Sequence, residues 1–206
     1  DTQRSNDYEI GLMNNHNNFS SNISTYLIDG KNELAYDSDA FQNINMNSTR
    51  RYGLEISIKN KIIDYATLIS DLTYSKAKYT SENQGTYATD FKDNDVPLVP
   101  EYSIDTSLEI NLSDFTTFTP SLKYQDDMRM ESDDENFQNT KIPSQFLFDI
   151  SISSKINKIL SANLMINNLF NQKYHNYAVA SSSTLGAYNA YPEPGRVITL
   201  SLSSKF

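Results

Sequence analysis

The residues best suited to chemistry lie in two polar segments. The first of these segments is rich in aromatic side chains. Residues 171–195 contain a histidine and a group of tyrosines, namely Tyr174, His175, Tyr177, Tyr188 and Tyr191. Such rings can hold a flat organic ligand by stacking and through contacts of the phenol groups. They can equally well pack against one another. The sequence leaves ligand binding and loop packing as equal alternatives for this segment.

The second segment is an acidic run over residues 126–135, with one arginine inside it. Carboxylates suit calcium, but the run lacks EF-hand spacing, so we expect a solvated loop. Met128 and Met130 suit Cu(I), yet two thioethers are too few to indicate a copper site. Arg129 matches an anionic ligand because its guanidinium binds carboxylates in bidentate fashion. Its acidic neighbours are equally good partners.

No catalytic motif is evident. Cysteine is absent, and the serines form neither a nucleophile elbow nor an S-x-x-K motif. The two histidines, His16 and His175, are expected at opposite ends of the molecule, so they cannot share a metal. The sequence therefore predicts no enzyme, no metal centre and no cofactor in this chain.

The composition favours a two-faced sheet. Hydrophobic residues make up only 38% of the chain, yet there are 14 tyrosines and 10 phenylalanines, which suits strands with one apolar and one polar face. The net charge of −9 argues against nucleic acid as a partner. The sequence contains no run of about 18 apolar residues, so it predicts no transmembrane helix. The first residues are no signal peptide, so we expect a mature or truncated chain.

Apolar residues alternate with polar ones at the strand period of two. In the third predicted strand, for example, Tyr52, Leu54 and Ile56 share one face and Glu55 lies on the other. We predict nine strands, covering residues 8–14, 19–29, 50–59, 64–78, 102–112, 115–125, 145–155, 159–170 and 196–206. Aromatic residues sit near the ends of the apolar faces, as in an interfacial girdle: Tyr8, Tyr52, Tyr74, Tyr102, Tyr124, Phe146 and Phe206.

The connections between these strands alternate between short and long. Short turns are predicted near residues 15–18, 60–63, 113–114 and 156–158, and long polar segments at 30–49, 79–101, 126–144 and 171–195. This pattern is typical of an outer-membrane barrel. The sequence predicts an all-β, antiparallel, up-and-down transmembrane barrel with short periplasmic turns and long extracellular loops.

Several motifs then resemble one family, the TonB-dependent outer-membrane receptors. The segment 163–174, NLMINNLFNQKY, is similar to the N-L-F-(D/N)-x-x-Y signature near the end of these receptors, and Pro194-Gly195-Arg196 to the P-G-R that opens their last strand. Residues 8–12, 51–55 and 99–102 resemble further motifs, in the order of the family. We expect Gly11 and Gly53 to relieve crowding or mark bulges, and Asn168 to satisfy backbone groups at a strand end.

The resemblance implies a particular fold and domain organisation. Residues 1–206 would be the C-terminal nine strands of a 22-stranded barrel, without the N-terminal plug and the earlier strands. An open sheet of nine strands has two unpaired edges, which a membrane does not tolerate. We therefore expect a fragment of a longer chain or one piece of a split receptor.

The resemblance also implies a function: active uptake of a scarce nutrient across the bacterial outer membrane, with a ferric siderophore, another iron chelate, haem or cobalamin as cargo. Expected partners are outer-membrane lipid, the missing plug and N-terminal strands, the TonB–ExbB–ExbD complex through the plug, and the outer-membrane assembly machinery. The candidate ligand contacts are Arg129, His175, Tyr177, Tyr188 and Tyr191. Phe206, with Leu200 and Leu202 on its face, resembles the assembly signal, although a terminal aromatic can also simply anchor at the interface.

Two other classes stay open at this point. One is a small passive porin-like barrel that closes by oligomerisation. The other is a soluble β-sandwich that serves as a binding module, for which turns every 8–12 residues without alternating loop length would be typical.

Overall fold

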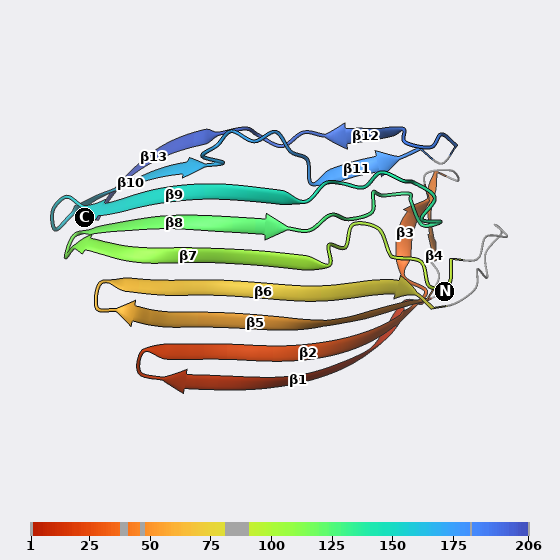
Figure 1. Ribbon diagram of the computed structural model, residues 1–206, viewed down its shortest axis with the longest axis horizontal. Coiled ribbons are helices and arrows are strands. Elements are labelled where there is room, and N and C mark those ends of the chain that lie inside the picture. The colour runs from red at the N-terminus through yellow and green to blue at the C-terminus, as the bar shows by residue number, and fades with distance from the viewer. Residues whose placement is uncertain (1, 38–40, 46–47, 81–90, 182, 206) are drawn as a thin grey trace.

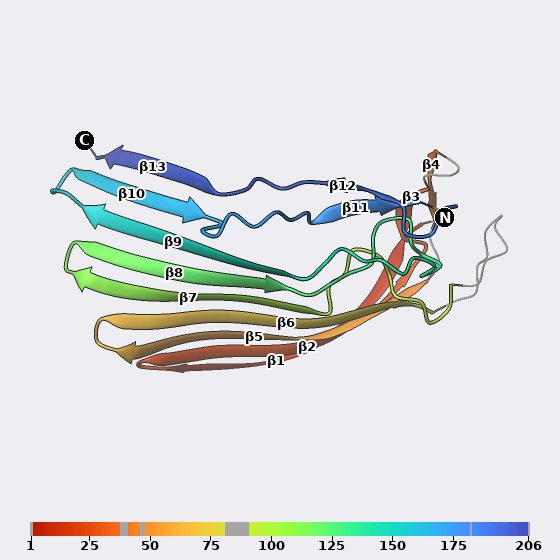
Figure 2. The same cartoon turned by 45° about the horizontal axis from the view of Figure 1, so that its top comes forward.

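One antiparallel sheet of nine strands forms the body of the protein (Figures 1 and 2). The structure, a computed structural model, describes residues 2–37, 41–45, 48–80, 91–181 and 183–205. In sheet order the strands are β1 (Arg4–His16), β2 (Phe19–Lys31), β5 (Thr49–Ile63), β6 (Ala66–Tyr79), β7 (Tyr102–Ser113), β8 (Thr116–Gln125), β9 (Gln145–Lys155), β10 (Leu160–Asn167) and β13 (Val197–Ser204).

The short turns gather at one end of the sheet and the long segments at the other, here called the turn end and the loop end (Figure 1). Two hairpins that the sequence did not predict lie inside long segments: β3 (Leu34–Asp37) with β4 (Gln42–Asn45), and β11 (Tyr177–Ala180) with β12 (Tyr188–Tyr191). No helix in the described residues is long and apolar enough to cross a membrane.

The strand register places apolar side chains opposite one another on neighbouring strands, so one apolar face continues across the whole sheet. Leu164 on β10, for example, faces Ile152 on β9 and Leu200 on β13. The large apolar side chains of this face are not buried: Ile10 on the edge strand β1 is 73% exposed, Ile152 on the inner strand β9 is 37% exposed, and Leu108 on β7 is half-buried. Among the described residues neither a second sheet nor a helix covers this face. A soluble sandwich would bury such residues between two sheets, so that alternative is wrong.

The apolar face has the height of a membrane barrel. From Tyr102 to Leu112 the chain covers about 34 Å along β7, which at a tilt of about 40° corresponds to roughly 26 Å, close to the usual apolar band of outer-membrane barrels. At the loop end of this band the predicted girdle residues lie side by side. The ring centroids of Tyr74 and Tyr102 are 5.2 Å apart, and those of Tyr124 and Phe146 are 4.5 Å apart.

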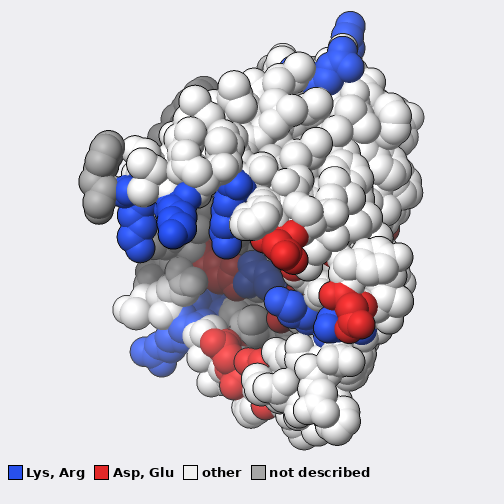
Figure 3. Space-filling view, turned by 90° about the vertical axis from the view of Figure 1, so that its left-hand side faces the viewer, with Lys and Arg blue, Asp and Glu red and all other residues white. Residues whose placement is uncertain are grey.

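The opposite face of the sheet is polar. Figure 3, which looks onto the turn end, shows charged side chains of both signs gathered in the hollow of the curved sheet, while the upper right of the view is largely uncharged. The fully buried apolar side chains do not lie between the strands of the band. They form two small clusters at the loop end, one around Met130 and Ile142 and the other around Tyr79 and Val96.

Several predicted strand ends needed correction. β1 covers Arg4–His16 and extends beyond the predicted residues 8–14 on both sides. β5 runs on to Ile63 because a bulge between Lys61 and Ile63 absorbs one extra residue, so the turn falls at residues 64–65. β10 ends at Asn167, not at Phe170, because Asn168 takes a positive φ of 52°. The last strand is shorter than predicted and ends at Ser204, and Phe206 lies outside the described residues.

The Asn168 side chain confirms its predicted role in satisfying backbone groups. Its Oδ1 accepts from the Gln172 N–H and its Nδ2 donates to the Gln172 carbonyl, both at 2.8 Å. Its own N–H donates to Asp149 at 2.7 Å. Asn171 ends the same motif: its Oδ1 accepts from the Arg196 N–H at 2.9 Å and would lie 2.6 Å from a Cβ at Gly195. The motif therefore joins the end of β10 to the start of β13.

Gly53 relieves crowding on the polar face, as expected, whereas Gly11 does not. A Cβ at Gly53 would lie 2.6 Å from the Tyr26 hydroxyl oxygen and would also overlap the Tyr74 carbonyl oxygen. A Cβ at Gly11 would meet its nearest atoms at 3.5 Å, which is ordinary contact. The Tyr26 ring of β2 thus packs over the bare backbone of β5.

We predict that Gly53→Ala destabilises the barrel and that Gly11→Ala does not. Because the backbone carbonyl of Tyr74 cannot move cheaply, the extra methyl group at position 53 should cost about 1–3 kcal/mol. The measurement is the temperature at which the detergent-solubilised receptor containing this chain loses its heat-modifiable migration. Equal midpoints for the two variants would contradict the packing of Tyr26 over Gly53.

Candidate functional site

Three of the long segments pack together at the loop end into one body, which we call the loop cap: residues 91–101, 126–144 and 171–195. Short backbone bridges hold it together. The Glu131 N–H donates to the Ala178 carbonyl and the Ala180 N–H donates to the Glu131 carbonyl, each at 2.9 Å. The Leu98 N–H donates to the Arg129 carbonyl at 3.0 Å. The segments are therefore joined to one another as well as to their own strands.

An apolar cluster lies between these segments. Met128, Met130, Ile142, Ala178 and Ala180 are all buried, and Met130 is only 1% exposed. The two methionines, considered above as copper ligands, instead fill the gap among aliphatic side chains. Their position explains the methionines as packing residues.

Two amide side chains take the place of a backbone ladder within the loop cap. Asn136 Oδ1 accepts from the Asp95 N–H at 2.8 Å and its Nδ2 donates to the Asp95 carbonyl at 2.9 Å. Gln138, which is 4% exposed, donates to the carbonyls of Ser181 and Thr184 and accepts from the Gly186 N–H at 2.7 Å. Each amide joins segment 126–144 to a different neighbour.

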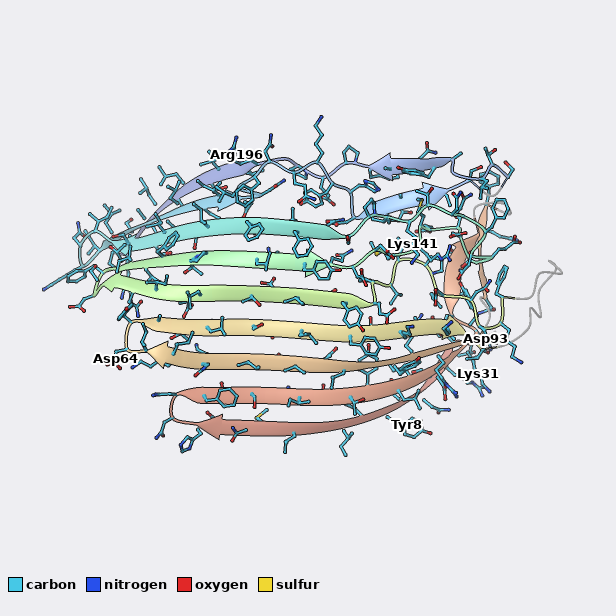
Figure 4. All side chains as sticks on the ribbon, viewed as in Figure 1. Tyr8, Lys31, Asp64, Asp93, Lys141 and Arg196 are labelled. Carbon is cyan, nitrogen blue, oxygen red and sulfur yellow. The ribbon has the colours of Figure 1, made fainter. Side chains whose placement is uncertain are left out.

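The expectation that the acidic run is solvated is wrong at its centre. Asp133 is 2% exposed, and its carboxylate accepts from the Gln138 N–H and from Arg129, both at 3.0 Å. Asp134 accepts a short hydrogen bond from the Tyr79 hydroxyl. Burial raises the pKa of Asp134, and the bond from Tyr79 only partly opposes this shift. The ends of the run do stay accessible, as at Asp127, which pairs with Lys141 at 2.7 Å. Figure 4 shows Lys141 toward the loop end.

The Arg129 side chain forms hydrogen bonds within the loop cap. Its Nη1 donates to Asp133 at 3.0 Å and to the Gln138 carbonyl at 2.9 Å. Its Nε is buried and has no hydrogen-bond partner among the described residues. Asp133, an acidic neighbour in the same run, is therefore one partner of Arg129.

The predicted aromatic residues divide between two faces of the β11–β12 hairpin. Tyr177 faces Tyr191 across the hairpin, with ring centroids 5.2 Å apart. Tyr188 faces Ala180 on the other side and stacks on His175, with centroids 6.1 Å apart. Tyr191 is 58% exposed and Tyr188 42%. The set therefore forms two separate aromatic pairs, not one cluster.

The Tyr177 phenol is held in its neutral form. A hydrogen bond to the Glu131 carboxylate raises the pKa of Tyr177 to about 12, and burial adds to the shift. At neutral pH this phenol can stack and donate a hydrogen bond, but it is not a phenolate.

A half-open cavity that sequence reasoning missed lies on the polar face below the loop cap. Its volume is about 300 Å³. Its wall includes Asp71, Asp105, Lys123, Gln125, Gln145 and Asn176. Gln145 is 5% exposed and donates to the His175 carbonyl at 2.9 Å, which connects the cavity wall to segment 171–195. Alternation had already assigned Asp105 to the polar face, but only the register brings it opposite Asp71 on one side and Lys123 on the other.

This architecture matches a known family. The family model described as "TonB dependent receptor-like, beta-barrel" matches residues 1–169, well over half of the chain. The chain belongs to this family. Receptor barrels of this kind are outer-membrane proteins of Gram-negative bacteria, so the apolar face meets lipid and the polar face lines the lumen. A comparison with curated proteins finds no significant match.

Solved structures of receptor barrels share the fold. The ferric yersiniabactin uptake receptor FyuA from Yersinia pestis has a TM-score of 0.81 at 15% identity, over 99% of this chain and 30% of that chain. The siderophore receptor PiuA from Acinetobacter baumannii has a TM-score of 0.76 at 19% identity, over 98% and 28%. The copper transporter OprC has a TM-score of 0.78 at 16% identity, over 99% and 31%. The chain thus spans about a third or less of the length of these proteins.

We predict that Gln138→Glu loosens the loop cap. The carboxylate keeps the size of the side chain but cannot donate to the carbonyls of Ser181 and Thr184, so those groups lose their partner at a cost of about 1–3 kcal/mol. Limited proteolysis of the receptor should then cut segment 171–195 several times faster. Asn139→Asp, at the exposed neighbouring position, is the control and should leave the rate unchanged. Equal rates for both variants would contradict the role of Gln138.

We predict that Asp134→Asn stabilises the loop cap at neutral pH. Since the pKa of Asp134 is raised in the folded protein, its contribution to stability is full below the unfolded value near 3.8 and is lost as pH rises through the folded value. The amide still accepts from Tyr79 but carries no charge to bury. Proteolytic resistance of the cap should fall in the wild type as pH rises above the unfolded value, and much less in the variant. Parallel pH profiles would contradict this assignment.

Proposed function

We propose that this chain is the C-terminal part of the barrel of a TonB-dependent receptor that actively imports a ferric siderophore or another iron chelate. The supporting observation is what similar structures are described as transporting. They include receptors described for ferric yersiniabactin, for siderophores and for ferric citrate. The copper transporter among them supports a metal cargo in general. Copper itself is disfavoured for this chain because Met128 and Met130 are enclosed in the apolar cluster.

The loop cap supplies surfaces that suit such a cargo. Tyr177 and Tyr191 offer two adjacent rings on one face of the hairpin, and Tyr188 with His175 offers a stacked pair on the other. Aromatic faces fit chelates with flat arms, and the Tyr191 phenol can donate to oxygen atoms of a chelate, whereas the Tyr177 phenol already donates to Glu131. In this proposal Arg129 acts through the cap, because its salt bridge with Asp133 fixes the segment beside Tyr177. The cavity with Lys123 lies below the cap, on the polar face of the sheet.

The same proposal implies that further parts of the receptor lie outside this chain. β1 and β13 are the outer strands of the sheet, so the earlier strands of a 22-stranded barrel would pair with them. A plug would fill the lumen and transmit energy from the TonB–ExbB–ExbD complex. Leu200 and Leu202, exposed on the lipid face of β13, would serve with Phe206 as the signal for the assembly machinery.

The first test is transport by cells that carry the complete receptor. Under iron starvation the receptor should be induced, and uptake of at least one ⁵⁵Fe-labelled chelate from a panel should require both the receptor and TonB. Haem, cobalamin and copper complexes complete the panel. Uptake of one of these instead of iron would overturn the cargo, and uptake without TonB would overturn active transport in favour of a passive pore.

The second test concerns the tyrosines. Tyr177→Ala with Tyr191→Ala should weaken binding of the transported chelate about tenfold, because each aromatic contact contributes about 0.5–1.5 kcal/mol. The measurement is calorimetric titration of the purified receptor. Tyr65→Ala is a matched control, since Tyr65 is as exposed, at 57%, as Tyr191 but lies at the turn end. An unchanged affinity in the double variant would exclude this tyrosine pair as the contact.

A further inference from the structure

The lumen-facing side chains of β8, β9, β10 and β13 include two rows of small, uncharged residues. These four strands are neighbours in the sheet (Figure 1). The register places one row at the level of Thr119 and a second row two residues nearer the turn end. The first row is Thr119, Ser151, Met165 and Thr199, and the second is Thr117, Ser153, Asn163 and Ser201. We call these eight residues the neutral wall. Met165 is its one apolar member.

The lumen-facing side of the strands before β8 is charged instead. Its carboxylates are Asp7, Glu9, Glu55, Asp71, Asp105 and Glu109. In the part of the chain that the structure describes, no ion pair involves any of them. Asp71 and Asp105 even lie directly opposite each other, an arrangement that destabilises two like charges. This half of the lumen is therefore suited to hold a cationic surface.

The lumen-facing cations of the same strands do not neutralise these carboxylates. Arg51 pairs with Glu33 at 2.6 Å, and Lys61 pairs with Asp64 at 3.0 Å. Both partners lie outside the set of lumen-facing carboxylates. The electrostatic requirement on this side of the lumen is thus left open within the described residues.

Polar groups of the neutral wall satisfy one another locally. The Ser153 hydroxyl donates to Asn163 Oδ1 at 3.0 Å, directly across β9 and β10. The Thr117 hydroxyl donates to Asn111 Oδ1 at 3.0 Å. Hydrogen bonds between neutral groups contribute only modestly, and these pairs carry no charge that a second surface must neutralise. The neutral wall therefore has little to hold a surface placed against it.

The neutral wall continues the cavity toward the turn end. Lys123 and Gln145 of the cavity wall lie on β8 and β9. Thr119 and Thr117 follow Lys123 on the same face of β8, and Lys123 to Thr117 covers about 20 Å along the strand. Between the cavity and the neutral wall lies the ion pair of Lys123 with Asp149, at 3.3 Å, whose charges offset each other. A molecule that leaves the cavity toward the turn end meets small neutral side chains.

We propose that the transported chelate passes between the neutral wall and the plug on its way to the periplasm. This inference rests on the proposed function, because it describes the route of the same cargo. A conducting path must bind its cargo weakly and at several places in succession, since a cargo that binds tightly does not leave. Rows of hydroxyl groups meet this requirement, because each can exchange one hydrogen bond with an oxygen-rich chelate.

The charged half of the lumen has the opposite property. Unpaired carboxylates such as Glu55 and Asp105 would form charge-assisted bonds with cations of a plug, and these are the stronger kind of hydrogen bond. A plug held on that side would leave its weaker contact, and hence the opening, along β8 to β13. Charge thus selects the side of the lumen on which the route lies.

The first experiment narrows the proposed route with a large side chain. In the complete receptor, Ser151→Trp should lower the maximal rate of ⁵⁵Fe-chelate uptake at least about tenfold. Affinity for the chelate should stay unchanged, because position 151 lies outside the loop cap. Thr67→Trp is the matched control, since Thr67 faces the lumen at the corresponding height on β6. It should keep the wild-type rate, as should Ser151→Ala. An equal loss in both Trp variants, or no loss in either, overturns the route.

The second experiment needs no cargo and no large side chain. The chain contains no cysteine, so Ser151→Cys and Thr67→Cys each introduce a single thiol into it. In the purified receptor with its plug, a maleimide dye should label the Ser151→Cys variant at least about tenfold faster, because the neutral wall borders the opening. After unfolding in urea the two variants should react at the same rate. Equal or reversed rates in the folded receptor overturn the route.

The two experiments separate this inference from the proposed function. If the wild type takes up no iron chelate, the proposed cargo is wrong, and the labelling rates still decide the route. If it takes up a chelate but the labelling rates are equal, the route alone is wrong.

Discussion

A strand that crosses hydrocarbon must find a partner for every backbone N–H and C=O group on the strands beside it. This constraint explains the continuous ladder from β1 to β13 and the exposure of its apolar side chains. It also makes register decisive, since a slip of one residue would move every apolar side chain into the lumen. The two register shifts, at Lys61–Ile63 and at Asn111–Ser113, both lie at the turn end. Across the apolar band the register does not shift, although Leu108 and Glu109 on β7 are unpaired opposite Thr119 and Pro120 on β8, because proline has no N–H to donate.

At the loop end the constraint no longer applies, and a different kind of order replaces it. Water and side chains can satisfy the backbone there, so the long segments need no ladder. Asn136 and Gln138 instead pair with backbone groups of neighbouring segments, and a small cluster around Met130 supplies the apolar contacts. Charge is then buried at a cost, as the raised pKa of Asp134 shows. The loop cap depends on contacts of particular side chains, whereas the sheet depends only on the alternation of apolar and polar residues along its strands.

This difference decides what the sequence could predict. Alternation located all nine strands and their faces, because period two needs only the class of each residue. It failed within a few residues at strand ends, where the left-handed Asn168 and the bulge at Lys61–Ile63 depend on local geometry. The hairpins β3–β4 and β11–β12 were missed because short strands in polar segments show little alternation. The burial of Asp133 and the pairing of Asp71 with Asp105 depend on contacts between segments distant in sequence, which no local pattern records.

The difference between the patterned sheet and the specific loop cap also explains why receptors for different cargoes share one barrel fold. Chains that share 15–20% of their residues with this one still superimpose with TM-scores of 0.70–0.81, because the membrane constrains residue class and register more than identity. Receptors for iron chelates and a copper transporter fit the sheet almost equally well. Discrimination must therefore come from positions that the pattern leaves free, and in the proposed receptor the aromatic pairs of the loop cap and the cavity wall around Lys123 are such positions within this chain. Under this proposal a substitution there would change the cargo without disturbing the sheet, whereas one at Gly53 would disturb the sheet whatever the cargo.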